Sequence, residues 1–305
     1  MIKVRHLAQF VLVGLAVTGA VTSCSVSRAA TPSADPARTP SASRSHPPPW
    51  PVTSWHYAPN SNFSHSGQYV PGADGFNLAD IDSYGKSKMD SLPAGVRGLV
   101  WLGDCGGATA AFKSTVDAFA GDQKLFGFYV TDEPIPSRCP ARNLLAEDNW
   151  IHAHVPGAKT FAILENLGTE DKPNFTGTYT PQDSGLDLIG LDPYPVRSEL
   201  GSPRYEEIPQ YVKGAESIGW PASSIVPVYQ TFGRSYPDDS NGYWSLPNAA
   251  EERQLLADWA AVIPHPAFDY AYSWGAQSGD AAMVESPSLQ SVFADKNKLA
   301  IRDST

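Results

Sequence analysis

Short apolar runs alternate with longer stretches of helical periodicity along most of the chain. Asn248 and Glu251 are spaced as a capping box at the start of the clearest helical stretch, residues 248–263. Alternation of this kind is typical of an α/β fold with parallel strands. Because the strands number eight over about 250 residues, the pattern predicts a single (β/α)₈ barrel. The eight expected strands are residues 53–57, 75–79, 96–102, 125–130, 160–164, 186–191, 225–229 and 268–273.

The first residues have the pattern of an export signal. Lys3 and Arg5 precede an apolar run over residues 10–21, which is too short to span a membrane comfortably and fits a signal peptide over residues 1–23. The run ends in Val-Thr-Ser-Cys at residues 21–24, which resembles a bacterial lipobox. The resemblance implies that Cys24 is lipidated. The alternative is an ordinary secretory signal cut near Ala30, which leaves Cys24 as a spare thiol.

A spacer follows the export signal. Residues 24–50 are rich in Ser, Ala and Pro and contain few large apolar side chains, so they cannot bury a core. We therefore expect the barrel domain to occupy residues 51–305. Lipid on Cys24 would hold this domain at the extracytoplasmic face of the cell membrane, with the anchor as its only membrane contact.

Composition excludes several classes of protein. The chain has 22 Lys+Arg against 32 Asp+Glu, for a net charge of -10, so a nucleic-acid partner is not expected. A GxGxxG motif does not follow the first strand, and a GxxxxGK[ST] motif does not occur. The three cysteines lack zinc spacing, and His152 and His154 point to different faces of a helix. We expect a monomer that needs neither a metal nor another cofactor.

Polar and aromatic residues follow most of the predicted strands. Active sites of (β/α)₈ barrels form at the carboxyl ends of the strands, so these residues are the candidates for chemistry. Asp82 and Asp104 are more simply explained as helix caps. Glu133 precedes Pro134, which disfavours helix, so we expect extended backbone there. The strand-end residues are Asp80, Asp82, Asp104, Asp132, Glu133, Glu165, Asn166, Asp192, Tyr194, Gln230 and Trp274.

The segment Phe-Tyr-Val-Thr-Asp-Glu-Pro at residues 128–134 resembles the end of the fourth strand in the cellulase and mannanase-like superfamily of barrel glycoside hydrolases. An Asn-Glu-Pro tripeptide there supplies the acid/base glutamate, and this chain has Asp132 in place of the Asn. The resemblance implies that Glu133 donates a proton to the glycosidic oxygen. It also implies that Trp274, which follows Ser273, lines the floor under one sugar.

One position departs from that family. The superfamily carries its nucleophilic glutamate after the seventh strand, where this chain has Gln230, and an amide cannot act as the nucleophile. Asp192 is the best remaining partner of Glu133 for a two-carboxyl mechanism, and Glu165 is the next. A third route pairs Glu133 with Asp132 while an acetamido group of the substrate attacks. Gln230 would then hold the substrate.

Other residues near the strand ends suggest substrate contacts and a disulfide. Trp101 and Tyr194 are placed to stack on sugar rings, and Asn166 to bond hydroxyl groups. A neighbouring Asp132 charge and aromatic walls are expected to raise the pKa of Glu133. Cys105 and Cys139 lie on adjacent loops and are expected to form a disulfide in an exported protein, with two free thiols as the alternative.

Two functions fit these observations. The first is a cell-surface glycoside hydrolase that acts on a polysaccharide or oligosaccharide. The second is a carbohydrate-binding lipoprotein on a barrel that has lost its nucleophile, which Gln230 suggests. Catalysis is favoured because a degraded site is expected to lose its acids, whereas Asp132, Glu133, Glu165 and Asp192 are all present.

Overall fold

A computed structural model describes residues 50–234, 244–277 and 279–302. The expected signal peptide, the lipidated Cys24 and nearly all of the spacer lie outside these residues, so they stay predictions. Within the described residues, none of the helices is both long and apolar enough to cross a membrane.

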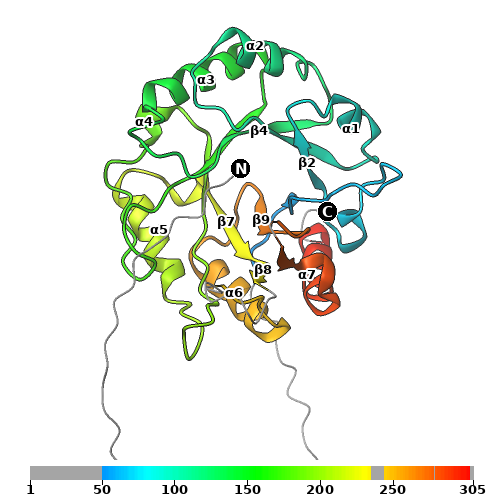
Figure 1. Cartoon of the computed structure of the whole chain (residues 1–305), viewed down its shortest axis with the longest axis vertical. Coiled ribbons are helices and arrows are strands. Elements are labelled where there is room, and N and C mark those ends of the chain that lie inside the picture. Colours follow the sequence, from blue (N-terminus) through cyan, green and yellow to red (C-terminus); the bar gives the residue numbers. More distant parts are fainter. Residues whose placement is uncertain (1–49, 235–243, 278, 303–305) are drawn as a thin grey trace, which may run out of the picture. The chain divides into compact units, whose positions relative to one another are not determined.

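Eight parallel strands close into a barrel, which confirms the predicted (β/α)₈ fold (Figure 1). The first and last strands pair with each other, since His56 lies opposite Asp269 and Tyr57 opposite Tyr270. The second strand begins three residues later than expected, so Asp80 and Asp82 are part of it instead of following it. The strands are β1 (His56–Tyr57), β2 (Leu78–Asp82), β3 (Arg97–Trp101), β4 (Leu125–Thr131), β5 (Lys159–Ile163), β6 (Leu188–Leu191), β7 (Ile225–Gln230) and β9 (Asp269–Tyr272).

Helices lie outside the strands, as Figure 1 shows for the labelled elements. The predicted capping box is present: the Asn248 side chain accepts from the Glu251 backbone N–H, and the Glu251 side chain accepts from the Asn248 N–H. The helices are α1 (Lys86–Ser91), α2 (Ala110–Asp117), α3 (Ala141–His154), α4 (Pro181–Ser184), α5 (Glu207–Ser217), α6 (Ala249–Val262) and α7 (Pro287–Arg302). Short 3-10 turns occur at Pro71–Asp74, Ala222–Ser224 and Met283–Glu285.

A second, two-stranded sheet was not predicted. The strands β8 (Phe232–Arg234) and β10 (Asp280–Ala282) pair antiparallel, with Ala281 opposite Gly233. They belong to the segments that follow β7 and β9. This sheet therefore ties together two neighbouring loops at the carboxyl end of the barrel.

Apolar side chains form two cores because successive strand residues point to opposite sides of the barrel wall. The inner core fills the lumen with aromatic rings: Phe161 packs edge-on against Phe268 at 5.0 Å between centroids, and Phe126 does so at 5.6 Å. The outer core lies between strands and helices. The lumen is thus solid, and chemistry is confined to the strand ends and their loops.

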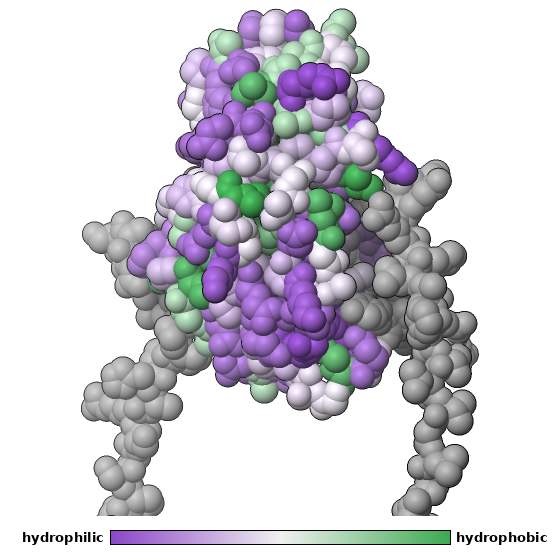
Figure 2. Space-filling view, turned by 90° about the vertical axis from the view of Figure 1, so that its left-hand side faces the viewer, coloured by the Kyte–Doolittle hydropathy of each residue, from purple (hydrophilic) through white to green (hydrophobic). Residues whose placement is uncertain are grey.

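Few large apolar side chains are exposed in the part of the chain that the structure describes. They are Val70, Tyr84, Leu167 and Val284. The face in Figure 2 is mostly hydrophilic, with isolated hydrophobic residues among polar ones. Single exposed apolar residues of this kind are ordinary for a folded protein and do not define a site.

Candidate active site

Glu133 and Asp192 form a carboxyl pair at the carboxyl end of the barrel. Glu133 follows β4, Asp192 follows β6, and their side chains are within hydrogen-bonding reach of each other. Two such carboxyls can hydrogen-bond only when one of them is protonated, which favours retention of a proton on the pair. Solvent reaches Glu133, which is exposed, and Asp192 is half-buried.

Several effects keep a proton on this pair at neutral pH. Desolvation by the surrounding protein, followed by the charges of Asp132 and Glu165, raises the pKa of Glu133 to about 8. Desolvation is also the largest cause at Asp192, and together with the Glu133 charge it raises the pKa of Asp192 well above its usual range. A carboxylic acid that is protonated at pH 7 is able to act as a general acid.

Asp132 is turned toward the lumen. The Tyr129 hydroxyl donates a 2.6 Å hydrogen bond to Asp132 Oδ1, and burial raises the pKa of this carboxyl. Below it, the Tyr57 hydroxyl donates to Asp80 Oδ1 at 3.0 Å. The structure therefore brings the predicted Asp132, Glu133 and Asp192 together and adds tyrosines beneath them.

The backbone of Glu133 differs from the expectation. Its φ is +41°, in the left-handed region, and the predicted extended conformation is wrong. Proline explains only why Glu133 avoids the right-handed helical region, and it leaves other conformations open. A non-glycine residue held there costs about 1–3 kcal/mol, and such residues concentrate at functional sites.

The loop after Glu133 is fixed at several points. The predicted disulfide between Cys105 and Cys139 is confirmed, with 5.5 Å between the two Cα atoms. The buried Tyr179 hydroxyl lies 2.7 Å from the Cys139 carbonyl oxygen and 3.2 Å from that of Pro134. These contacts hold the loop that carries the left-handed residue.

Gln230 does not face a substrate. Its side chain is fully buried, Oε1 accepts from the Val196 N–H at 2.9 Å, and Nε2 donates to the carbonyls of Val196 at 2.8 Å and Ser245 at 3.0 Å. The predicted substrate contact is therefore wrong. The amide instead clamps the loop after β6, which carries Asp192, because only an amide both donates and accepts here.

Two other predicted substrate contacts also have structural roles. Trp274 is 5% exposed and packs against Phe76 in the outer core, so it does not form a sugar floor. Asn166 uses its amide within its own loop: Oδ1 accepts from the Gly168 and Asn174 N–H groups, both at 2.9 Å, and Nδ2 donates to the Tyr211 hydroxyl at 2.9 Å.

The remaining aromatic candidates lie at the strand ends. Trp101, at the end of β3, is half-buried and packs edge-on against Tyr129 with centroids 4.7 Å apart. Tyr194 lies nearly parallel to Tyr272 at 6.2 Å and edge-on to Phe232 at 4.9 Å. Tyr272 is half-buried beside Tyr194, so it joins the predicted pair as a candidate sugar contact.

Two further carboxylates act on the pair. Glu165, predicted from its strand-end position, is half-buried, and its charge is among the causes that raise the pKa of Glu133. Glu170 has the same effect on both Glu133 and Asp192. Sequence reasoning missed Glu170 because it lies several residues beyond β5, in a loop whose fold is not marked by the strand pattern.

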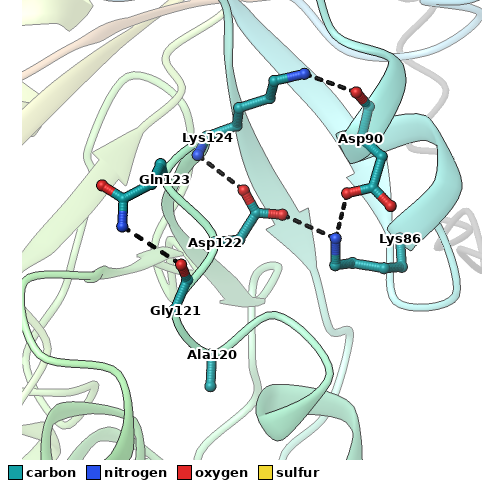
Figure 3. A pocket seen from close by; sticks show the side chains of 7 residues that line it. All are labelled: Lys86, Asp90, Ala120, Gly121, Asp122, Gln123 and Lys124. Atoms are coloured by element: carbon teal, nitrogen blue, oxygen red, sulfur yellow. Dashed lines mark hydrogen bonds and ion pairs between the residues drawn. The ribbon is translucent and has the colours of Figure 1, made fainter.

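A separate surface hollow carries no candidate chemistry. Figure 3 shows its lining of Lys86, Asp90, Ala120, Gly121, Asp122, Gln123 and Lys124. Lys86 pairs with Asp90 and, at 3.1 Å, with Asp122, while Lys124 Nζ donates to the Asp90 carbonyl at 2.6 Å. Residues 120–124 lead into the amino end of β4, opposite the carboxyl pair.

Among the described residues, no group of three or more His, Cys, Asp and Glu side chains is arranged to hold a metal ion.

Comparisons with solved structures agree with the fold. The GH18 chitinase ChiB from the chitin utilization locus of Flavobacterium johnsoniae superposes with a TM-score of 0.53 at 10% identity, covering 81% of this chain and 94% of that one. The C-terminal domain of a putative chitinase from Desulfitobacterium hafniense DCB-2 gives a TM-score of 0.50 at 11% identity, covering 80% and 99%. Similarity at this level shows a shared (β/α)₈ fold, and the neighbours include glycoside hydrolases.

Matches by sequence were not found. None of the family models matches the chain, and none of the curated proteins does. The assignment of an activity therefore depends on the site.

Proposed function

We propose that the protein is a glycoside hydrolase in which Glu133 protonates the glycosidic oxygen. The observation that carries this proposal is the close pair of Glu133 and Asp192, with the pKa of Glu133 raised to about 8, at the carboxyl end of a (β/α)₈ barrel. The half-buried rings of Trp101 and Tyr194 beside it are suited to stack on sugar rings.

The closeness of the pair bears on the mechanism. The two carboxyls of retaining glycosidases are about 5–5.5 Å apart, and those of inverting ones about 6.5–9.5 Å. Because the Glu133 and Asp192 side chains are within hydrogen-bonding reach of each other, the proposal uses Asp192 neither as the nucleophile nor as the base that activates water. Its role in the proposal is to share a proton with Glu133 and to orient it.

The attacking group in this proposal is the acetamido oxygen of a 2-acetamido sugar. This oxygen attacks the anomeric carbon, the glycosidic C–O bond breaks, and the leaving oxygen takes the proton of Glu133. Water then adds to the anomeric carbon, restores the acetamido group and returns a proton to Glu133. The proposal assigns the stabilisation of the positive charge that develops to Asp132 and Asp192.

Location is a further part of the proposal. The pattern of residues 1–24 supports export and a lipid anchor on Cys24, with residues 24–50 as a spacer. A disulfide between Cys105 and Cys139 is consistent with this location, because disulfides persist outside the reducing cytosol.

The test compares chromogenic oligosaccharides of N-acetylglucosamine and of glucose, cleaved by wild type and by Glu133→Gln. We expect hydrolysis of the 2-acetamido substrates alone, and a loss in kcat of about 10²–10⁴ in Glu133→Gln, because the amide cannot donate the proton that a carboxylic acid does. Glu216→Gln, an exposed glutamate of α5, is the matched control and is expected to keep full activity.

Three results would contradict the proposal. Equal turnover by Glu133→Gln would remove the general acid. Equal cleavage of glucose and N-acetylglucosamine substrates would reject the acetamido route and favour Glu165 as the second carboxylate. Binding of oligosaccharide by wild type without any released sugar would favour a non-catalytic binding protein.

A further inference from the structure

A hydrogen-bonded relay ties the loop after β5 to helix α5. Asn166 Nδ2 donates to the Tyr211 hydroxyl at 2.9 Å, and that hydroxyl donates to Glu170 Oε2 at 2.6 Å. Tyr211 is only 2% exposed, and the Phe175 ring packs edge-on against it at 5.6 Å. Because a phenol has a single proton, accepting from Asn166 leaves this proton for Glu170.

The loop itself is closed by its own backbone. The Leu167 N–H donates to the Asn174 carbonyl at 2.9 Å, and Thr169 and Lys172 exchange two backbone hydrogen bonds at 3.0 and 3.2 Å. Glu170 therefore lies in a tight turn whose base is fixed by Asn166. The position of its carboxylate is determined before any ligand binds, which lowers the entropy cost of using it.

Glu170 lies in the loop after β5, at the same end of the barrel as the carboxyl pair, and it neither gives nor takes a proton in the steps described above. Its charge is one cause of the raised pKa of both Glu133 and Asp192. The residue is half-buried, so solvent reaches it. Oε2 is engaged by Tyr211, whereas within the described segments Oε1 takes part in no hydrogen bond.

We propose that Glu170 is a specificity-determining residue, which accepts hydrogen bonds from substrate hydroxyl groups through Oε1 and repels sugars that carry a carboxylate. This inference rests on the proposed function, because it assigns the sugar class taken by the same site. A carboxylate is a strong acceptor for hydroxyl groups, and its charge adds to that of Glu165 and the Glu133–Asp192 pair. A uronic acid sugar would meet all of these charges, whereas a neutral sugar would not.

The experiment compares two probes: the N-acetylglucosamine tetramer, and the same tetramer with its primary alcohols oxidised to carboxylates. Wild type, Glu170→Gln, Tyr211→Phe and the control Glu216→Gln are assayed on both. Wild type should favour the neutral tetramer at least about tenfold in kcat/KM, the ratio expected of one charged contact. Glu170→Gln keeps an acceptor for Tyr211 but should raise KM for the neutral tetramer, with kcat little changed, and should lower the discrimination about tenfold.

Tyr211→Phe separates position from charge. It leaves the Glu170 charge in place but frees the side chain, so KM should rise while rejection of the oxidised tetramer persists. Unchanged KM and unchanged discrimination in Glu170→Gln would overturn the inference. So would an equal loss of discrimination in Glu216→Gln, because that result would reflect net charge alone.

A failure of the proposed function is distinguished by binding. The two tetramers are also titrated calorimetrically into Glu133→Gln, with and without Glu170→Gln. If wild type does not hydrolyse the tetramer but binds it, the proposed function fails, and the same titrations still decide the inference. Weaker binding of the neutral tetramer upon Glu170→Gln supports the role of Glu170, whereas identical affinity rejects it, as does the absence of binding to either tetramer.

Discussion

At the scale of single residues, Glu133 is set apart by both its backbone and its surroundings. Its left-handed φ of +41° is held by the disulfide-braced loop behind it. Its carboxyl shares a proton with Asp192, and neighbouring charges disfavour ionisation. The strain and the raised pKa occur at the same residue, which is the combination expected of a general acid kept protonated at neutral pH.

The pKa of Glu133 predicts the alkaline limit of activity. The charge of Glu165 is among the causes that raise this pKa, so Glu165→Gln should lower it. In the proposed mechanism the acid form is the active one, so activity should be lost as the pH rises through the pKa. We therefore expect kcat/KM of wild type to fall above about pH 8, and that of Glu165→Gln to fall at lower pH.

The measurement is a pH profile of kcat/KM on the cleaved tetramer, with Glu216→Gln as the control. A shift of the alkaline limb to higher pH in Glu165→Gln would contradict the assignment. Loss of all activity at every pH would instead identify Glu165 as the second carboxylate.

The sequence predicts which residues meet in the site only where their place at the end of a strand determines what they contact. Asp132, Glu133 and Asp192 follow buried strands whose carboxyl ends meet, so their proximity follows from the topology. Gln230 and Trp274 also lie at strand ends, but their orientation depends on the pleat and on loops that pack over them. A side chain that turns outward becomes part of the scaffold, and the pattern of apolar residues does not reveal that choice.

At the scale of elements, the loop after β6 positions Asp192 and Tyr194 through buried polar contacts. Gln230 bonds both the N–H and the carbonyl of Val196. Arg197 and Glu207 form a bidentate pair at 2.7 and 2.9 Å, both side chains being buried. Gln230 belongs to β7 and Glu207 to α5, so these hydrogen bonds attach the loop to two regular elements and fix it from both sides.

The contacts of Gln230 predict the outcome of placing a carboxylate at this position. Gln230→Glu removes the donor that faces the Val196 and Ser245 carbonyls and places a carboxyl against them in a fully buried site. We expect a loss of about 2–4 kcal/mol in the free energy of unfolding and no gain in hydrolysis. Urea unfolding measures the first, and the tetramer assay the second.

Gln210→Glu is the matched control, because Gln210 is exposed on α5 and the same change there should be nearly neutral. A gain of hydrolysis in Gln230→Glu with stability intact would show that position 230 faces the substrate after all.

Elements were predicted well where they are long and periodic. All eight barrel strands and the capped helix α6 were found, because buried parallel strands are continuous apolar runs between turn signals. The two three-residue strands β8 and β10 were missed, since each is too short to show alternation. Their pairing depends on loops brought together by the closed barrel.

At the scale of the whole molecule, closure of the barrel depends on its shortest strand. β1 has two residues, and it pairs with β2 on one side and β9 on the other. So short a strand adds little backbone bonding. His56 Nδ1 lies 2.9 Å from Asp269 Oδ1, and Lys296 of α7 pairs with the other oxygen of Asp269. These side chains, all at most 1% exposed, join β1, β9 and the last helix.

Breaking the ion pair at this closure should cost far more than breaking one on the surface. Burial alone would raise the pKa of Asp269, but Lys296 and His56 outweigh it and lower the pKa. A carboxyl whose pKa is lowered by folding stabilises the folded state at pH values above its unfolded pKa of about 3.9. That stabilisation is lost as the pH falls through the pKa of the folded state. Lys296→Met leaves Asp269 buried with His56 as its remaining partner, so it should cost about 3–5 kcal/mol at pH 7 and less near pH 4.

Urea unfolding at both pH values measures this difference, with two comparisons that isolate the buried charge. Lys159→Met breaks the 3.3 Å pair between the exposed Lys159 and the half-buried Asp187, and should cost less than about 1 kcal/mol. Adding Asp269→Asn to Lys296→Met removes the stranded charge and should recover part of the loss. Equal losses of stability for Lys296→Met and Lys159→Met would mean that the barrel closes without help from the Lys296–Asp269 pair. A large loss that Asp269→Asn relieves would identify Lys296 as the residue that neutralises the buried charge where β1 meets β9.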